Sequence, residues 1–298
     1  MTRSRWGVRA RDLEYAVLDV ETTGLQPAEG ARVCEIAVVR MRGDGTVVRE
    51  FTTLVDPRVP VTGQQFHGIA GGDVIGAPTA ADLVGDLTEL FSGAVVVGHN
   101  LDFEERFLAA EFVPAGLPAG AVGLCTLLAL RSQVELRRYS LPRACHALNG
   151  RWPTGQHTAL GDARACAQML AELIANAPGE LRFLGPRPVT LPPPPRPAGQ
   201  ARLKSRLPTG TLAARLSRGS LRGAPAHPLR RWPSLWRPLE LEPQMCTGPF
   251  TPEQRTAAVT AAKARWLRMG AVSATAALTG TVAAAVAARA LVRRVLPS

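Results

Sequence analysis

One stretch decides which fold and chemistry to expect: Tyr15-Ala16-Val17-Leu18-Asp19-Val20-Glu21-Thr22-Thr23-Gly24. It begins with an apolar run of the kind that is buried as a strand. Asp19 and Glu21 follow two residues apart, so on a strand their side chains point to the same face. Two adjacent carboxylates repel each other unless a cation lies between them, and hard oxygen ligands suit Mg²⁺ or Mn²⁺. By themselves, these residues fit a solvated strand end equally well.

A second buried strand is predicted at Ala94-Val95-Val96-Val97-Gly98, and His99-Asn100-Leu101-Asp102-Phe103 follows it directly. Apolar residues at helical spacing predict a helix over 103–112. Asp102 therefore lies at a strand-to-helix junction, where sites in α/β sheets gather. Asp102 with Glu105 also fits a capping box, so a structural N-cap is the alternative. For His99 the pattern favours a hydrogen-bonded loop histidine.

The third group is His157-Thr158-Ala159-Leu160-Gly161-Asp162-Ala163. Helical spacing of apolar residues predicts a helix over 164–174, and Asp162 lies near its start. His157 lies in a Gly-rich approach, where a histidine is free to move and can exchange a proton near neutral pH, as a general base must. The alternative is a surface loop histidine followed by an Asp that the helix dipole favours.

Together the three groups supply four carboxylates and one imidazole, which two-metal hydrolysis of a phosphodiester requires. The candidate catalytic residues are Asp19, Glu21, Asp102, His157 and Asp162. We expect Asp19, Glu21 and Asp162 to hold two divalent cations, Mg²⁺ or Mn²⁺, with Asp102 as a further ligand, directly or through water. We expect His157 to take the proton of the attacking water.

In this order, the three groups resemble the motifs of the His-type DEDD 3′→5′ exonucleases, most closely the proofreading (epsilon) subunits of bacterial DNA polymerase III. The resemblance covers roughly residues 12 to 176. It implies release of nucleoside 5′-monophosphates from a free 3′ end, with single-stranded DNA as the expected nucleic acid and a polymerase or repair protein as the expected partner. It also implies these substrate-binding residues: Thr22, Thr23, Gly24, Leu25, Phe66, His67, Ile69, Asn100 and Phe103.

The order of predicted elements gives the fold class. Strands are predicted at 32–40 and 47–55, joined by a turn at Gly43-Asp44-Gly45, and a helix at 80–91. The chain then alternates between helices and strands, which predicts an α/β fold with a mixed sheet flanked by helices. The resemblance implies that this is the ribonuclease H-like fold. The order of the strands does not follow from the sequence.

Charge and composition divide the chain into parts. The net charge of +11 consists of −5 in residues 1–180 (16 Arg against 21 Asp and Glu) and +16 in residues 181–298 (19 Lys and Arg against 3 Glu). We therefore predict an exonuclease domain at 1–178, a disordered, basic, Pro- and Arg-rich linker at 179–250, and an Ala-rich C-terminal helix at 251–298. The linker either binds nucleic acid through its charge or only keeps the chain in solution.

Residues 269–288 carry no charge, and a 20-residue helix is about 30 Å long, enough to cross a bilayer. Their Ala, Ser and Thr content makes the segment only marginally apolar, so a membrane contact and an Ala-rich soluble helix both remain open. The first twelve residues lack the apolar segment of a signal peptide, and the five cysteines form no Cys-x-x-Cys pair. Both observations predict reduced thiols and a cytoplasmic location, with membrane association as the alternative.

Three functions fit these patterns. The favoured one is a metal-dependent 3′→5′ exonuclease that acts on DNA in proofreading or repair. The others are an RNA-trimming exonuclease and an inactive nucleic-acid-binding or membrane-tethering protein on the same fold. Because all the candidate catalytic residues precede residue 180, cleavage of short single strands is expected to need nothing that follows.

Overall fold

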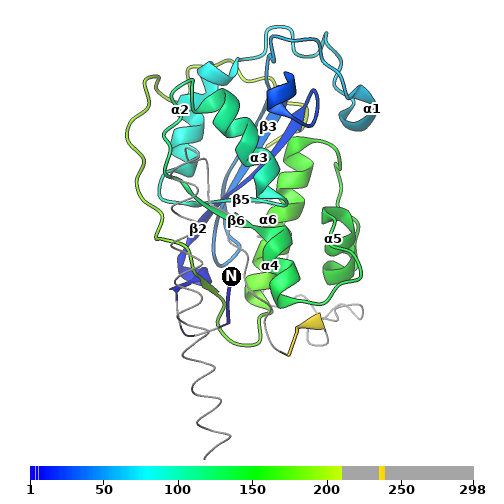
Figure 1. Ribbon diagram of the computed structural model, residues 1–298, viewed down its shortest axis with the longest axis vertical. Helices are drawn as coiled ribbons and strands as arrows, with labels where there is room; N and C mark the ends of the chain where they lie inside the picture. Colours follow the sequence, from blue (N-terminus) through cyan, green and yellow to red (C-terminus); the bar gives the residue numbers. More distant parts are fainter. Residues whose placement is uncertain (4, 6, 210–234, 239–298) are drawn as a thin grey trace, which may run out of the picture. The chain divides into compact units, whose positions relative to one another are not determined.

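A computed structural model describes residues 1–209 and 235–238, apart from residues 4 and 6 (Figure 1). All of these residues belong to one compact unit, Met1–Arg255. The predicted C-terminal helix at 251–298, including the uncharged segment 269–288, lies outside the described residues. Within the described part, no helix is both long and apolar enough to cross a membrane.

The central sheet has five strands in the order β4-β3-β2-β5-β6. β2 (Glu14–Thr22) pairs antiparallel with β3 (Val33–Arg42), which pairs antiparallel with β4 (Val47–Leu54). On its other side, β2 runs parallel to β5 (Val95–Gly98), and β5 runs parallel to β6 (Val122–Cys125). The mixed sheet and the predicted hairpin are confirmed. Because β2 and β5 are parallel, the residues that follow both strands meet at one edge of the sheet.

The helices follow the predicted pattern, with differences at their ends. They are α1 (Gln64–His67), α2 (Ala80–Phe91), α3 (Leu101–Phe107), α4 (Thr126–Gln133), α5 (Leu141–Asn149) and α6 (Ala159–Ala175). The predicted helix at 103–112 begins two residues earlier, and its second half is a π-helical turn. α6 begins before residue 164 because Thr158 caps it: the Thr158 Oγ1 atom accepts a hydrogen bond from the Gly161 N–H at 3.2 Å.

The core occupies both faces of the sheet because the residues of β2 alternate between them. Tyr15 and Val17 pack with residues of α4, α5 and α6, whereas Ala16 and Leu18 pack with residues of α2 and α3. A strand buried on both faces is apolar at every position, which explains the continuous run in the sequence. Asp19 and Glu21 continue the Tyr15 face, so their side chains lie toward α6.

The prediction of a disordered linker at 179–250 is wrong for its first part, because residues 181–209 pack on the domain. β7 (Arg182–Phe183) pairs with β1 (Val8–Arg9) in a two-stranded sheet. Leu191 is buried in the core on the α2 side, and Lys204 donates its backbone N–H to Thr53 Oγ1 at 2.9 Å. Isolated apolar residues therefore anchor a segment whose average composition is typical of disorder. The boundary predicted at residue 178 lies too early.

Candidate active site

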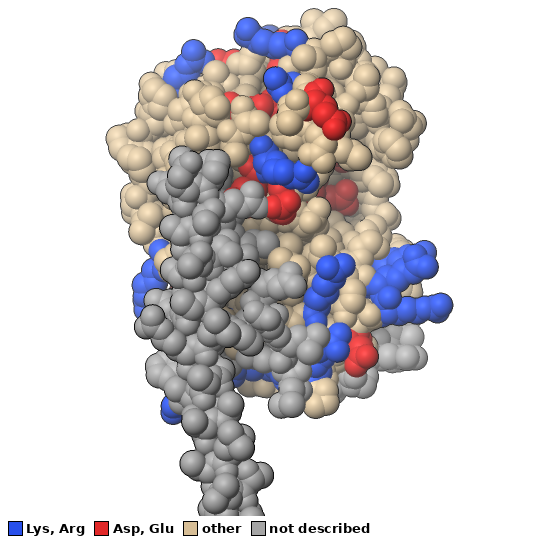
Figure 2. All heavy atoms as spheres, in the orientation of Figure 1, with Lys and Arg blue, Asp and Glu red and all other residues tan. Residues whose placement is uncertain are grey.

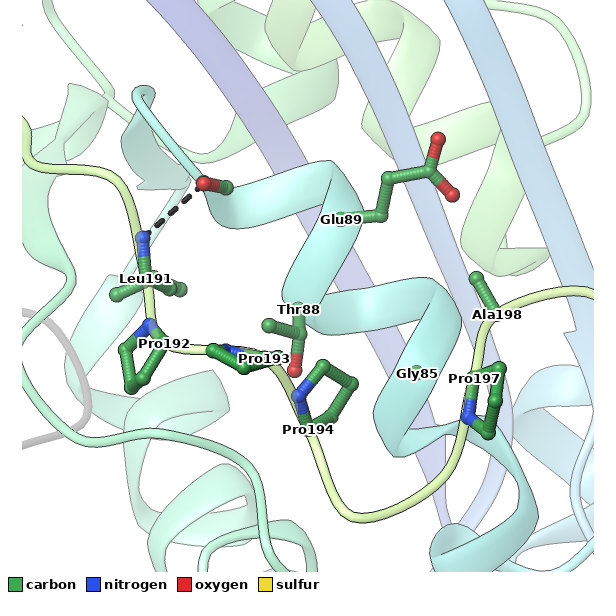
Figure 3. Close-up of a pocket in the computed structure, with 10 residues that line it drawn as sticks. Gly85, Thr88, Glu89, Leu191, Pro192, Pro193, Pro194, Pro197 and Ala198 are labelled. Carbon is green, nitrogen blue, oxygen red and sulfur yellow. Dashed lines mark hydrogen bonds between the residues drawn. The ribbon is translucent and has the colours of Figure 1, made fainter.

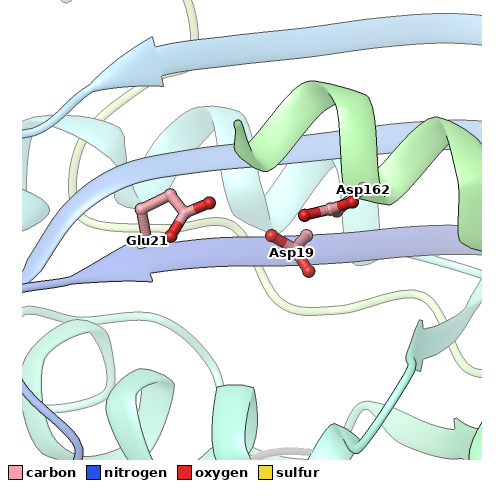
Figure 4. Close-up of side chains that lie close together, drawn as sticks. All are labelled: Asp19, Glu21 and Asp162. Carbon is pink, nitrogen blue, oxygen red and sulfur yellow. The ribbon is translucent and has the colours of Figure 1, made fainter. Parts of the chain in front are cut away.

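Three of the predicted carboxylates meet where β2 ends. Asp19 and Glu21 lie on the β2 face that α6 covers, and Asp162 extends from the first turn of α6 (Figure 4). One carboxylate oxygen from each of the three residues lies within 4.8 Å of the other two. Asp162 is distant from β2 in the chain, so the packing of α6 against the sheet creates this group.

The group is electrostatically unfavourable without a cation. Burial, and then the charges of Glu104 and Asp162, raise the pKa of Asp19 well above its usual value. Burial, and then Asp162, raise the pKa of Glu21 to about 7. Burial also raises the pKa of Asp162. Several hard oxygen donors that repel each other at this separation form a set that suits a divalent cation.

Asp102 does not join this group. Its side chain is exposed, and its Oδ2 atom lies 3.5 Å from the Arg106 Nε atom, one helical turn further on. The capping alternative is also wrong, because α3 begins at Leu101 and Asn100 is its N-cap residue. Asp102 points to solvent because it follows the first residue of a helix whose buried face begins with Leu101.

Glu104, two residues after Asp102, is a buried carboxylate of α3. Only 5% of its surface is exposed, and its Oε2 atom is buried with no hydrogen-bond partner among the described residues. Burial raises the pKa of Glu104 to about 8, and its charge affects Asp19 more than any other carboxylate does. Gly98 at the end of β5 makes room, since a Cβ atom there would lie 3.0 Å from Glu104 Oε2.

A signal for Glu104 was present in the sequence. Glu104 follows Leu101 by three residues and precedes Leu108 by four, so all three share one helix face. Both leucines are fully or almost fully buried. Burying a carboxylate costs free energy unless another group compensates its charge. An acidic residue on a buried helix face therefore indicates a residue of the site.

His157 lies on the loop that leads into α6. Its side chain is exposed, and its φ angle of 62° lies in the left-handed region that residues other than glycine rarely adopt. Its backbone N–H donates to Asp162 Oδ2 at 3.0 Å. This hydrogen bond and the charge of His157 both oppose the rise that burial causes in the pKa of Asp162. The backbone of the predicted base is therefore bonded to a predicted metal ligand.

Two residues that the sequence analysis did not select complete the surroundings of the site. Glu35 on β3 is paired with Glu21 on β2, and only 1% of its side chain is exposed. Its carboxylate accepts the Ala159 N–H at 2.9 Å and forms an ion pair with Arg206. A charge within an apolar strand was the available signal for Glu35. No signal in the sequence pointed to Arg206, because it lies in the segment predicted to be a linker.

The predicted substrate residues at the end of β2 form a turn. Thr22 donates its hydroxyl to the Gly24 carbonyl at 2.7 Å, and the Thr23 hydroxyl accepts the Arg32 N–H at 3.0 Å. Leu25 follows with 74% of its surface exposed. The turn thus presents an apolar side chain to solvent beside the carboxylates.

The segment around α1 differs from the prediction. Phe66 is 69% exposed, but His67 and Ile69 are buried. The His67 Nδ1 atom accepts the Ile69 N–H, so its Nε2 atom carries the proton and donates to the Thr62 carbonyl, both at 3.0 Å. His67 and Ile69 therefore hold the loop together, and of the three predicted residues Phe66 is the one that a ligand can reach.

The residues after β5 have mixed roles. Asn100 is exposed, with a φ angle of 118°. Phe103 is partly buried and packs against Phe107, with ring centroids 5.0 Å apart. His99 bonds to Thr126 and to the Tyr139 carbonyl, and burial lowers its pKa to about 4. The prediction that His99 is a hydrogen-bonded loop histidine is confirmed.

Comparison with known proteins agrees with this geometry. A family model described as "Exonuclease" matches residues 16–170. The chain belongs to this exonuclease family. The matched region contains the carboxylate group, Glu104 and His157, and it ends before Arg206. The ribonuclease H-like fold is thereby confirmed, together with the resemblance stated above.

Individual relatives match about half of the chain. The DNA polymerase III subunit epsilon-like protein of Rhodobacter capsulatus is 34% identical over 168 residues, which are 54% of this chain and 24% of the relative. The DNA polymerase III subunit epsilon of Rickettsia felis is 29% identical over 169 residues, 54% of this chain and 74% of the relative. The chain thus spans about a quarter of the Rhodobacter protein's length.

A solved structure described as a full-length 3′-exonuclease has the same fold. It superimposes with a TM-score of 0.51 at 13% identity, covering 68% of this chain and 76% of the other. At this identity the likeness concerns the fold alone.

Proposed function

We propose that this chain is a divalent-metal-dependent 3′→5′ exonuclease that acts on single-stranded DNA ends and releases nucleoside 5′-monophosphates. The observation that carries the proposal is the group of Asp19, Glu21 and Asp162, whose oxygen atoms lie within 4.8 Å of one another. The charge of the buried Glu104 acts on Asp19, and the backbone of His157 bonds to Asp162. Membership of the exonuclease family supports it.

Asp19, Glu21, Glu104 and Asp162 would hold the cations, and their oxygen donors suit Mg²⁺ or Mn²⁺. When bound, the cations supply positive charge that stabilises the reacting phosphate and makes water a better nucleophile. The carboxylates in turn keep that positive charge at the end of β2, next to the loop of His157.

His157 would act as the general base. Its exposed ring can accept the proton of the attacking water at a ring nitrogen. Asp162 holds the backbone of His157 through the 3.0 Å hydrogen bond, so the loop that carries the base is tied to a metal ligand. This arrangement uses Asp162 both as a ligand and as an anchor.

The terminal nucleotide would lie between Leu25 and Phe66. The two side chains are largely exposed, and Thr62 donates its hydroxyl to the Thr23 carbonyl, which joins their two segments. Aromatic and apolar side chains can pack against any base, so this contact would be tolerant of sequence. Figure 2 shows one face of the domain, on which basic side chains lie among acidic ones.

The proposal extends to partner and location. The names of the relatives place them with DNA polymerase III, and we propose a polymerase or repair protein as the partner of this chain. The cytoplasm is the proposed location. Four cysteines among the described residues are buried thiols, as expected in a reducing compartment.

The test is cleavage by the full-length chain of 3′-labelled single-stranded DNA, duplex DNA and RNA of one sequence, with Mg²⁺, Mn²⁺ or EDTA. We expect metal-dependent release of mononucleotides, fastest from single-stranded DNA, and none from Asp19→Asn. Cleavage confined to RNA would replace the DNA assignment with RNA trimming. Binding without cleavage, equal in wild type and Asp19→Asn, would leave a binding protein on an exonuclease fold.

A further inference from the structure

Residues 189–209, which we call the strap, run along α2 toward the candidate site. At the start of the strap, Gly93 donates its N–H to the Val189 carbonyl, and the Leu191 N–H bonds to Ser92 Oγ at 3.1 Å (Figure 3). The prolines that follow line a pocket of about 300 Å³ against α2. Near its end, the strap bonds to β4, where the Lys204 carbonyl accepts the Leu54 N–H at 2.7 Å.

The sequence of α2 is adapted to the strap. Gly85 lies in the middle of this helix, where glycine costs about 1 kcal/mol relative to alanine. A Cβ atom at Gly85 would lie 2.5 Å from the Arg196 carbonyl oxygen and from the Pro197 carbonyl carbon. The strap crosses the helix at this point, and only a residue without a side chain permits the crossing. The Gly199 N–H then bonds to Asp86 Oδ1 at 3.1 Å.

The strap places Arg206 at the candidate site. The Arg206 Nε atom donates to Glu35 Oε1 at 3.0 Å, and its Nη2 atom donates to Glu35 Oε2. Its Nη1 atom donates to the His67 carbonyl at 2.7 Å, and Nη2 also donates to the His157 carbonyl at 3.4 Å. One guanidinium therefore joins β3, the α1 segment and the loop of His157.

These contacts offset two unfavourable features of the site, a pair of like charges and a disfavoured backbone conformation. Glu35 is paired with Glu21 across two strands, and like charges in that position destabilise a sheet. The bidentate guanidinium neutralises Glu35, whose Oε2 atom is then fixed where it accepts the N–H of Ala159 at the start of α6. The loop of His157 has a disfavoured φ angle, so it needs contacts such as the one from Arg206 to keep its conformation.

We propose that Arg206 is a positioning residue for the exonuclease reaction. It holds the loop of the general base and the α1 segment in register with the carboxylates, and the strap is therefore part of the exonuclease domain. This inference rests on the proposed function, since it concerns the same site.

The test compares Arg206→Gln, Arg206→Lys and a control, Arg202→Gln, in the full-length chain with Mn²⁺ and a short single-stranded DNA. Arg202 is an exposed residue of the same strap. We expect Arg206→Gln to lower kcat by roughly 10–100-fold, because small misplacements of a catalytic group cost about that much. KM should change less than kcat. Arg206→Lys should recover only part of the rate, since lysine keeps the charge but loses the bidentate geometry. Arg202→Gln should behave as wild type.

A second variant separates positioning from general destabilisation. Gly85→Ala improves the helix propensity of α2 but displaces the strap, so we expect kcat to fall although Arg206 is intact. Combined with Arg206→Gln, the two losses should not add, because both act through one contact. Manganese affinity, measured calorimetrically, should be unchanged or tighter in Arg206→Gln, since that variant removes a positive charge near Glu21.

The outcomes distinguish the two proposals. An inactive wild type would refute the proposed function. An active wild type with Arg206→Gln of equal or higher kcat would overturn the role of Arg206, and a higher rate would make the strap an obstruction. Loss of manganese binding or of cooperative unfolding in both Arg206→Gln and Arg206→Lys would assign Arg206 to folding, which also overturns the inference.

Discussion

The backbone N–H of His157 donates a hydrogen bond to the Oδ2 atom of Asp162 at 3.0 Å. Asp162 also contributes an oxygen to the group formed with Asp19 and Glu21. Burial raises the pKa of Asp162, and this hydrogen bond opposes the rise because it favours the ionised form. The candidate base and the candidate metal ligands are thus coupled through Asp162, so its replacement should affect both, whereas His157→Ala keeps the backbone N–H that makes this bond.

Asp19→Asn should abolish hydrolysis in Mg²⁺ and in Mn²⁺. The amide keeps the shape of the side chain but removes a charge from a set of mutually repelling carboxylates. The melting temperature in EDTA should therefore hold or rise while activity is lost. Near wild-type cleavage by this variant would refute the metal-site assignment.

His157→Ala should slow cleavage by roughly 10²–10⁴-fold, the usual range for loss of a general base. Calorimetric affinity for Mn²⁺ should change little, because His157 is not assigned as a ligand. A matched control is His146→Ala, which removes another exposed histidine, one that stacks on Trp152. Equal effects of the two substitutions would remove His157 from the mechanism.

Glu104→Gln should reduce kcat at least as much as Glu21→Gln does, whereas Asp102→Asn should stay within a few fold of wild type. The physical reason is that Glu104 is buried beside Asp19, while Asp102 is exposed beside Arg106. Single-turnover cleavage of labelled DNA at saturating Mn²⁺ compares Glu104→Gln with Asp102→Asn. The reverse order of effects would restore Asp102 as the fourth carboxylate.

Glu111→Gln should change how stability depends on pH. Burial raises the pKa of Glu111 to about 7 from 4.5, while its Oε1 atom accepts the Val33 N–H at 2.9 Å and Arg32 partly opposes the shift. Below pH 4.5 the carboxyl is protonated in both states. Between pH 4.5 and about 7 the unfolded chain binds fewer protons than the folded chain, so the free energy of unfolding falls as the pH rises.

The glutamine keeps an acceptor for Val33 and removes this titration. Relative to wild type, Glu111→Gln should gain about 1–2 kcal/mol between pH 4.5 and pH 8, a range that allows for solvent screening. Urea unfolding in EDTA at the two pH values measures the difference. An identical pH dependence in both proteins would show that Glu111 titrates normally.

The sequence by itself was sufficient for β2 and its two carboxylates. Strand periodicity depends only on local geometry, so a buried run followed by Asp19 and Glu21 predicts one face with two ligands. The motif of His157 and Asp162 is similarly local, since only four residues lie between its members at the start of a helix. The mixed sheet, the hairpin and α2 were predicted for the same reason.

Tertiary structure alone decided which other residues reach the site. Asp102 and Glu104 differ by two residues on a helix, and the direction in which α3 packs determines which one is buried. Glu35 and Arg206 meet because β3 pairs with β2 and because the strap crosses α2 at Gly85. These contacts join residues that are 171 positions apart, and no local pattern records such a separation. The average composition of residues 179–209 indicated disorder, whereas a few buried side chains and one crossing point hold the segment on the domain.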